Sequence, residues 1–129
     1  KGDLPFDEKI KLFVANYIDT ISANPFLPLF IINEINQNPG RLGPIVNLMG
    51  VIKEEISKDI KVKIDSGEFR DIDPVQLFLN IIAMALFPFL AKPIIQGAFS
   101  LTEEMFQEFL EERKKLIPDI ILNYLKIKN

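Results

Sequence analysis

The chain contains no cysteine, no histidine and no tryptophan. Without cysteine it has no thiolate nucleophile, iron–sulfur cluster or disulfide, and without histidine it has no imidazole base, haem ligand or usual zinc ligand. We therefore expect no metal site, no cofactor and no enzymatic activity. The lack of cysteine also fits a reducing compartment, and we expect a cytoplasmic protein.

Positive charge and long apolar runs are also scarce. The 15 Lys plus Arg residues against 18 Asp plus Glu give a formal net charge of −3, whereas a nucleic-acid-binding face is normally basic. The longest apolar run, Leu77 to Ala91, is interrupted by Asn80 and Pro88 and is shorter than the roughly 20 residues of a membrane span. The first residues do not resemble a signal peptide. We expect no DNA contact by this chain itself and no membrane segment.

What the chain does have is apolar content, 48% of its 129 residues. That is enough for one globular domain, residues 1–129, whose core needs no covalent support. Prolines and glycines divide the sequence into segments whose apolar residues recur at helical spacing, and strict alternation is hard to find. We predict an all-α fold, an antiparallel helical bundle. The expected helices cover residues 5–23, 26–36, 43–66, 74–87 and 102–126, with a continuation to residue 97 broken by two prolines.

Several residues mark the expected helix ends. Asn24, which precedes a proline, is expected to close the first helix and cap the second. Gly67 is a natural C-terminal cap for the third helix. Asp73 followed by Pro74 is the firmest helix start in the chain. Pro118 predicts a kink in the last helix, which is expected to begin at a Ser100 or Thr102 cap. 

Three helices carry more apolar surface than one neighbour can bury. The second is apolar nearly all round, which favours a place in the interior. The fourth and the last either lie at the centre of a monomeric bundle or form half of an intermolecular four-helix bundle with a second copy. On the second interpretation the dimer interface consists of Phe89, Met105, Phe106, Phe109, Leu116, Ile117, Ile120 and Ile121.

The order and spacing of these pieces resemble a known family. The pieces are Phe30-x-x-x-Glu34, Asn38-Pro39, a helix ending at Gly67, Arg70-x-x-Asp73-Pro74, and Phe87 followed six residues later by Pro93. Together they span nearly the whole chain and resemble the C-terminal regulatory domain of tetracycline-repressor (TetR) family transcription regulators. No single piece is decisive, because much of the pattern is helix capping.

The resemblance implies a helical domain that binds a small effector and forms a homodimer. In the family, effector binding shifts the first helix of this domain, which is joined to an N-terminal helix-turn-helix. The present chain begins at what resembles that first helix, so operator DNA would be a partner only through a domain this chain lacks. The implied function is that of a repressor domain that responds to a small, largely apolar ligand. The alternative is a stand-alone helical module that binds an apolar ligand or a partner helix.

Candidate ligand-binding residues are those that lie on apolar helices yet suit a plain core poorly. The polar candidates are Tyr17, Asn33, Asn47, Gln76 and Asn80, and the candidate walls are Phe13, Phe30, Met49, Met84 and Phe87. Each polar candidate has an ordinary alternative as a satisfied buried group or a solvent-facing amide, and the walls are equally typical of a core. Gly50 in mid-helix indicates close packing or room for a ligand. Glu34 is expected to pair with Arg41 or Arg70.

Overall fold

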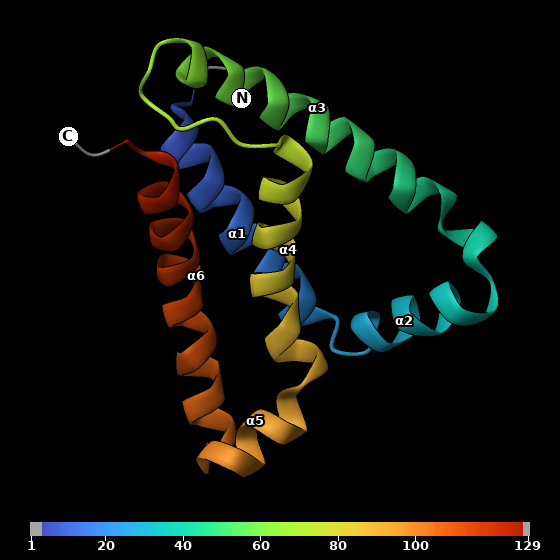
Figure 1. Cartoon of the computed structure of the whole chain (residues 1–129). Helices are drawn as coiled ribbons and strands as arrows, with labels where there is room; N and C mark the ends of the chain where they lie inside the picture. The colour runs from blue at the N-terminus through green and yellow to red at the C-terminus, as the bar shows by residue number, and fades with distance from the viewer. Residues whose placement is uncertain (1–3, 128–129) are drawn as a thin grey trace.

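The computed structural model describes residues 4–127, and helices make up most of it (Figure 1). The predicted all-α fold is confirmed. The first and last residues of the predicted domain, 1–3 and 128–129, lie outside the described residues. The helices are α1 (Phe6–Ala23), α2 (Leu27–Gln37), the 3-10 turn η1 (Pro39–Leu42), α3 (Gly43–Asp65), α4 (Pro74–Leu90), α5 (Lys92–Phe99) and α6 (Glu103–Leu125).

Three helices form the centre of the bundle. Helix α1 packs along α6 and α4, and α4 also packs along α6, which runs antiparallel to both (Figure 1). Each helix buries one stripe at helical spacing, as amphipathic helices do around a common core. The buried stripes are Phe6, Ile10, Val14, Ile18 and Ile21 on α1; Leu77, Phe78, Ile81 and Ala85 on α4; and Phe106, Leu110, Ile117, Ile121, Leu122 and Leu125 on α6.

The linker between α3 and α4 closes one end of this core. The ring of Phe69 in the linker is buried and meets the ring of Phe6 edge-on, with centroids 5.5 Å apart. The backbone N–H of Arg70 donates to the carbonyl of Leu125 at 2.8 Å. An ion pair of 2.9 Å between Lys126 Nζ and Asp7 Oδ2 joins the end of α6 to the start of α1. The beginning, the middle and the end of the described chain are thus held together at one point.

Most predicted helix ends are confirmed. Asp73 caps α4 by accepting a hydrogen bond from the backbone N–H of Val75 at 3.0 Å, and Thr102 caps α6 in the same way. Gly67 follows α3 with a φ of +84°, the left-handed conformation that favours glycine. Asn24 closes α1, and its side-chain amide donates to the carbonyl of Thr20, but α2 begins three residues later without a side-chain cap. The prediction that Asn24 closes the first helix is therefore confirmed, and the prediction that it caps the second helix is wrong.

The prolines do not break the helices where the sequence suggests. Pro88 lies inside α4, which continues to Leu90, and the break comes at Ala91, where α4 and α5 meet at a bend of 70°. Proline has no N–H to donate to the carbonyl four residues earlier, which is that of Met84. Arg113 of α6 supplies the missing donor, because its Nη2 donates to the Met84 carbonyl at 2.8 Å. Likewise α6 runs through Pro118 as one helix.

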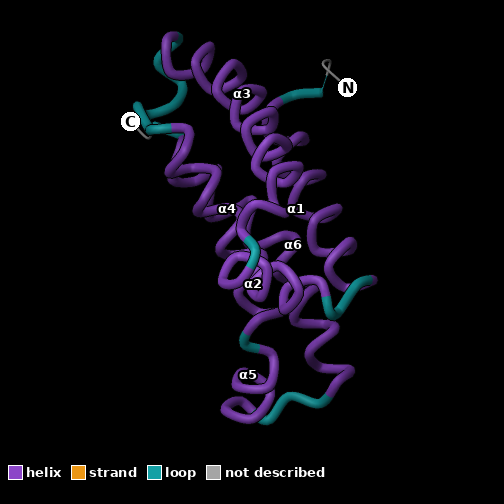
Figure 2. The backbone as a smooth tube through the Cα atoms, turned by 90° about the vertical axis from the view of Figure 1, so that its right-hand side faces the viewer, coloured by secondary structure: helices purple, strands orange, loops and turns teal. Residues whose placement is uncertain are grey.

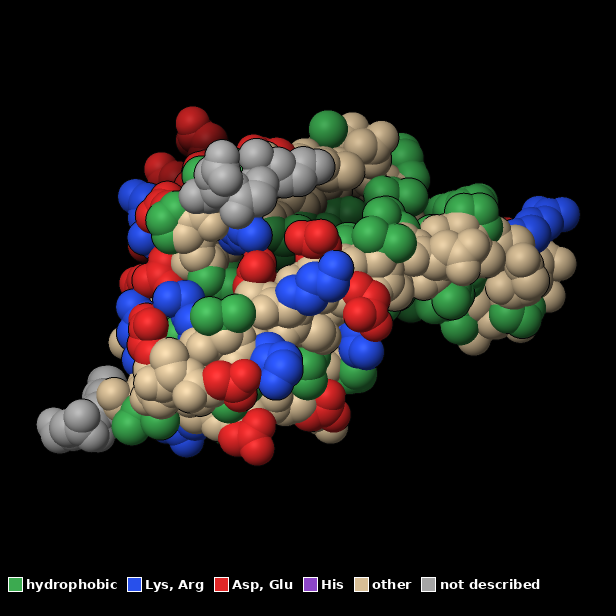
Figure 3. All heavy atoms as spheres, turned by 90° about the horizontal axis from the view of Figure 1, so that it is seen from above, with side chains coloured by type: hydrophobic (Ala, Val, Ile, Leu, Met, Phe, Trp, Pro, Cys, Tyr) green, Lys and Arg blue, Asp and Glu red, His purple; other side chains and the backbone are tan. Residues whose placement is uncertain are grey.

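Helix α2 contradicts its predicted place in the interior. It lies with η1 and the first half of α3 in an arm beside the bundle (Figure 1), and Figure 2 views the molecule from the side of this arm. Figure 3 shows hydrophobic side chains on the surface of the arm. Phe26 is 80% exposed, and Phe30 is 55% exposed. An apolar stretch folds inward only where the bundle leaves room, and α1, α4 and α6 already fill their own core. The one buried carboxylate of the arm, Glu34, pairs with Arg41 at 3.7 Å, one of its two predicted partners.

Candidate functional site

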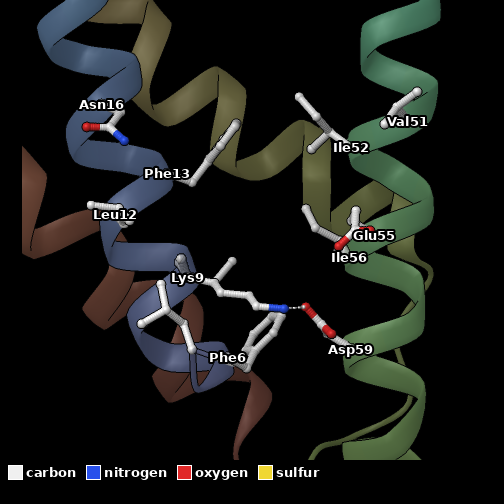
Figure 4. Close-up of a pocket in the computed structure, with 12 residues that line it drawn as sticks. Phe6, Lys9, Leu12, Phe13, Asn16, Val51, Ile52, Glu55, Ile56 and Asp59 are labelled. Carbon is white, nitrogen blue, oxygen red and sulfur yellow. Dashed lines mark hydrogen bonds and ion pairs between the residues drawn. The ribbon is translucent and has the colours of Figure 1, made fainter. Parts of the chain in front are cut away.

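A cavity of about 540 Å³ lies between α1 and α3 (Figure 4). We call it the α1–α3 cavity. Helix α1 packs on α6 and α4, and α3 packs on α4, so α1 and α3 face one another across this space. Its size falls within the usual range for small-molecule sites. The lining side chains are Leu4, Phe6, Lys9, Ile10, Leu12, Phe13 and Asn16 on one side and Val51, Ile52, Glu55, Ile56 and Asp59 on the other.

Helical spacing explains why these residues share the cavity. On α3, Ile52, Glu55, Ile56 and Asp59 stand at positions i, i+3, i+4 and i+7, which lie on one face of a helix. On α1, residues 6, 9, 10, 13 and 16 follow the same rule. The deeper members, Phe6, Ile10 and Ile56, also belong to the core. The floor of the cavity is therefore apolar and fixed, while its rim carries the charged groups.

One ion pair crosses the cavity. Figure 4 shows Lys9 reaching from α1 to Asp59 on α3, and the Nζ to Oδ2 distance is 2.9 Å. This hydrogen bond, with the nearby negative charge of Glu55, raises the pKa of Lys9 above its ordinary value. Lys9 is consequently charged across the whole physiological pH range.

The structure does not bring the ten predicted ligand-binding residues together. Only Phe13 lines the α1–α3 cavity. Phe30, Asn33, Asn47 and Met49 lie exposed on the α2–α3 arm. The other four, Gln76, Asn80, Met84 and Phe87, line the opposite surface of α4. The ten residues therefore do not line one common pocket within the described residues, and their role in ligand binding stays a prediction. Gly50 also faces open space and not a close helix neighbour.

Tyr17, the tenth candidate, stacks on Phe13 with ring centroids 6.0 Å apart but does not line the cavity. Burial raises the pKa of its phenol above the ordinary value, because the phenolate form loses hydration. The chain has only two tyrosines and no tryptophan, so the Tyr124→Phe variant leaves Tyr17 as its one phenol. We expect absorbance at 295 nm in this variant to titrate with a midpoint above pH 10 and conformational stability to fall as pH rises through that range.

Titration of the same variant in urea gives the reference, since the unfolded chain exposes the phenol fully. A folded midpoint equal to the unfolded one would show that the Tyr17 ring is not packed against Phe13 as described.

A second apolar surface runs along α4 and α6, on the far side of α4 from the arm. Two adjoining grooves share Ala83 and Met84 and are lined along α4 by Gln76, Asn80 and Phe87. Along α6 the grooves are lined by Phe109, Ile120 and Tyr124. Met105 and Leu116 share their helical face, because the five residues recur at intervals of four or seven. We call this surface the α4–α6 face.

The α4–α6 face contains only part of the predicted dimer interface. Met105, Leu116 and Ile120 are about half exposed and Phe109 is partly buried, so these four are available to a second copy. Phe106, Ile117 and Ile121 are not, because they are 1%, 0% and 4% exposed and pack inside the chain's own core. Phe89 is half-buried against that core. The prediction is thus corrected for the three buried residues.

The Arg113 guanidinium lies in the middle of the α4–α6 face and forms no ion pair with any carboxylate among residues 4–127. The Arg113 guanidinium stands 5.7 Å from the centroid of the Phe109 ring, and its Nε is buried without a hydrogen-bond partner among the described residues. Desolvation lowers the pKa of Arg113. Its bond to the Met84 carbonyl fixes α6 against α4 at this point.

Sequence reasoning missed the charged rim of the α1–α3 cavity. The usable signal was the mixture of Glu55 and Asp59 with Ile52 and Ile56 on one helical face, since a core face has no place for carboxylates. Over residues 4–127, no group of three or more acidic side chains is placed to hold a metal ion. Within the same residues no single helix has the length and apolarity of a membrane span. Helices α4 and α5 together have the length and apolarity of a span, but the two helices are bent by 70° relative to one another.

Compared with known proteins, the chain matches no family model and no curated protein sequence.

Proposed function

We propose that the chain is the effector-sensing and dimerisation domain of a TetR-like transcription regulator, a repressor that releases operator DNA when a small, largely apolar molecule binds. The observation that carries the proposal is the α4–α6 face. Two neighbouring antiparallel helices there present exposed apolar residues along one common surface. A contiguous apolar surface of this kind is typical of a protein–protein contact.

A second copy is the partner that fits this face best. Two antiparallel helices from each subunit, related by a two-fold axis, complete a four-helix bundle, and the same patch then serves both subunits. Such an interface buries Phe87, Ile120 and Tyr124, which are 61%, 45% and 51% exposed in the single chain. Most of the groups it would bury are apolar or aromatic, and the polar ones on the face are Gln76, Asn80 and Arg113.

Helix α1 would connect effector binding to the rest of a regulator. One of its faces lines the α1–α3 cavity and another packs on α6. A ligand in the cavity would therefore act directly on α1, the helix that in the family continues into the DNA-binding domain. A ligand shifts such an equilibrium only as far as it prefers one position of α1 over the other.

Distance measurement between spin labels tests both parts of this proposal. The chain has no cysteine, so Lys11→Cys, at an exposed position on α1, gives one label per subunit. We expect a single defined label-to-label distance, which exists only in a dimer, and a shift of its mean when the neutral apolar probe N-phenyl-1-naphthylamine is added. The proposal fails if the labels show no dipolar coupling, or if the distance is unchanged at saturating probe.

The alternative, a stand-alone binding module, has one observation in its favour. The α2–α3 arm exposes Phe26, Leu29 and Phe30 together, which a partner helix could cover. In that case the labelled chain would remain a monomer without a label-to-label distance, and the reading frame would begin at this domain without a preceding helix-turn-helix.

A further inference from the structure

We propose that the ligand of the α1–α3 cavity is an apolar monovalent cation, a molecule with a bulky hydrophobic body and one positive charge. This inference rests on the proposed function, because it names the class of effector for the same domain. Three features of the cavity support it: the charged side chains of its lining, the aromatic side chains of its lining, and its volume.

The groups that line the cavity carry one net negative charge. Three ionised groups line it, namely Lys9, Glu55 and Asp59. Lys9 and Asp59 neutralise one another in the 2.9 Å ion pair. Among the described residues Glu55 has no ion-pair partner within 4.0 Å. Outside the lining, Lys53 pairs with Glu54 and Lys11 with Glu8, whereas the exposed Lys58, three residues along α3 from Glu55, has no ion pair within the described residues.

Glu55 is exposed, so water screens part of its attraction for a cation, but the apolar atoms on its cavity side screen it less than bulk water would. A cation in the cavity would be attracted by the carboxylate of Glu55 and by that of Asp59. An anion would have to displace Asp59 from Lys9 while facing Glu55. The local electrostatics therefore favour positive ligands over negative ones of the same shape.

The aromatic side chains add to this preference. Phe6 and Phe13 both line the cavity, although Phe6 is 5% exposed and also packs on Phe69. A cation over the face of a phenyl ring gains about 0.5–2 kcal/mol per contact. The remaining wall consists of Ile10, Ile52 and Ile56, which suit a hydrophobic body. A volume of about 540 Å³ admits a drug-sized molecule and exceeds what a small inorganic cation would need.

A pair of isosteric probes tests the sign of the preferred charge. Tetraphenylphosphonium and tetraphenylborate have nearly the same shape and opposite charge. We expect the intact chain to bind tetraphenylphosphonium, measured by isothermal titration calorimetry, with one site per subunit and at least about tenfold more tightly than tetraphenylborate. The Glu55→Gln variant is expected to lose most of this preference, since it removes the unpaired charge and keeps the side-chain size.

Two tryptophan variants locate the site. Val51→Trp places a large ring at the exposed rim of the cavity and is expected to weaken tetraphenylphosphonium binding at least about tenfold. Val62→Trp, at an exposed position of the same helix that does not line the cavity, is the matched control and should bind like the unmodified chain. Tighter binding of the borate, or equal binding by the two tryptophan variants, would overturn the inference.

The oligomeric mass of the same samples separates this inference from the proposed function. If the unmodified chain is dimeric but does not prefer tetraphenylphosphonium over tetraphenylborate, the cation inference alone is overturned. A monomeric sample overturns the dimerisation domain, whichever probe it binds.

Discussion

The Ile120→Lys variant is expected to be a folded monomer where the unmodified chain is a dimer. Ile120 is 45% exposed and lies on the α4–α6 face beside Asn80 and Met84. In a two-fold interface each substitution appears twice, so two ammonium groups would be buried without partners. Burying an unpaired charge costs several kcal/mol, and about 3 kcal/mol already weakens association about 100-fold. Light scattering after size-exclusion chromatography at micromolar concentration measures the mass.

The matched control for this variant is Val62→Lys. Val62 is exposed on α3, outside the α4–α6 face, so the same change of side chain is expected to leave the dimer intact. Circular dichroism should report the same helix content for both variants. If the two variants have the same mass, α4 and α6 do not form the interface.

Truncation of Ile117, three residues earlier on α6, is expected to reduce stability and not association. Ile117 has no exposed surface and packs in the core between α1, α4 and α6. Removing a buried isoleucine side chain to the β-carbon typically lowers the free energy of unfolding by about 2–5 kcal/mol. Urea denaturation of Ile117→Ala should be measured in the Ile120→Lys background, where dissociation of subunits does not contribute to the transition.

Leu116→Ala in the same background is the comparison for Ile117→Ala. Leu116 is the adjacent residue and is about half exposed on the α4–α6 face, so its truncation in a monomer should cost less than about 1 kcal/mol. Equal losses at the two positions would mean that α6 is rotated relative to the description given above.

These two adjacent positions show what the sequence could and could not predict. The apolar stripe of α6 was recognised, but it is so wide that it covers both the side that packs on α1 and the side that faces outward. Helical periodicity identifies apolar positions and does not say which chain covers them. Phe106, Ile117 and Ile121 were for this reason assigned to the wrong surface, while Met105, Leu116 and Ile120 lie on the exposed one.

The helix boundaries were predictable because they depend on neighbouring residues only. Asp73 and Thr102 cap their helices through contacts two or three residues away, and Gly67 takes a positive φ that the sequence alone suggests. Pro88 was misjudged because the donor that satisfies the Met84 carbonyl comes from Arg113, 29 residues later. A local rule cannot include such a distant partner.

The candidate site was the least predictable part. Phe30 and Asn33 are predicted from their place on an apolar helix, and Asn47 from its place near a helix end, which does not determine whether the three face a common pocket. In the structure the direction of the α2–α3 arm depends on how α3 crosses α4, which no local pattern encodes. Only Phe13 lies on the α1–α3 cavity, and the charged groups that characterise its rim, Lys9, Glu55 and Asp59, resemble ordinary solvated residues when the sequence is read alone.

The mass of the unmodified chain in solution tests the central claim most directly. The claim is that the α4–α6 face joins two copies. Sedimentation equilibrium at micromolar concentration should then give a mass twice the 14.8 kDa of the single chain. A mass equal to that of the single chain across this concentration range would contradict the account.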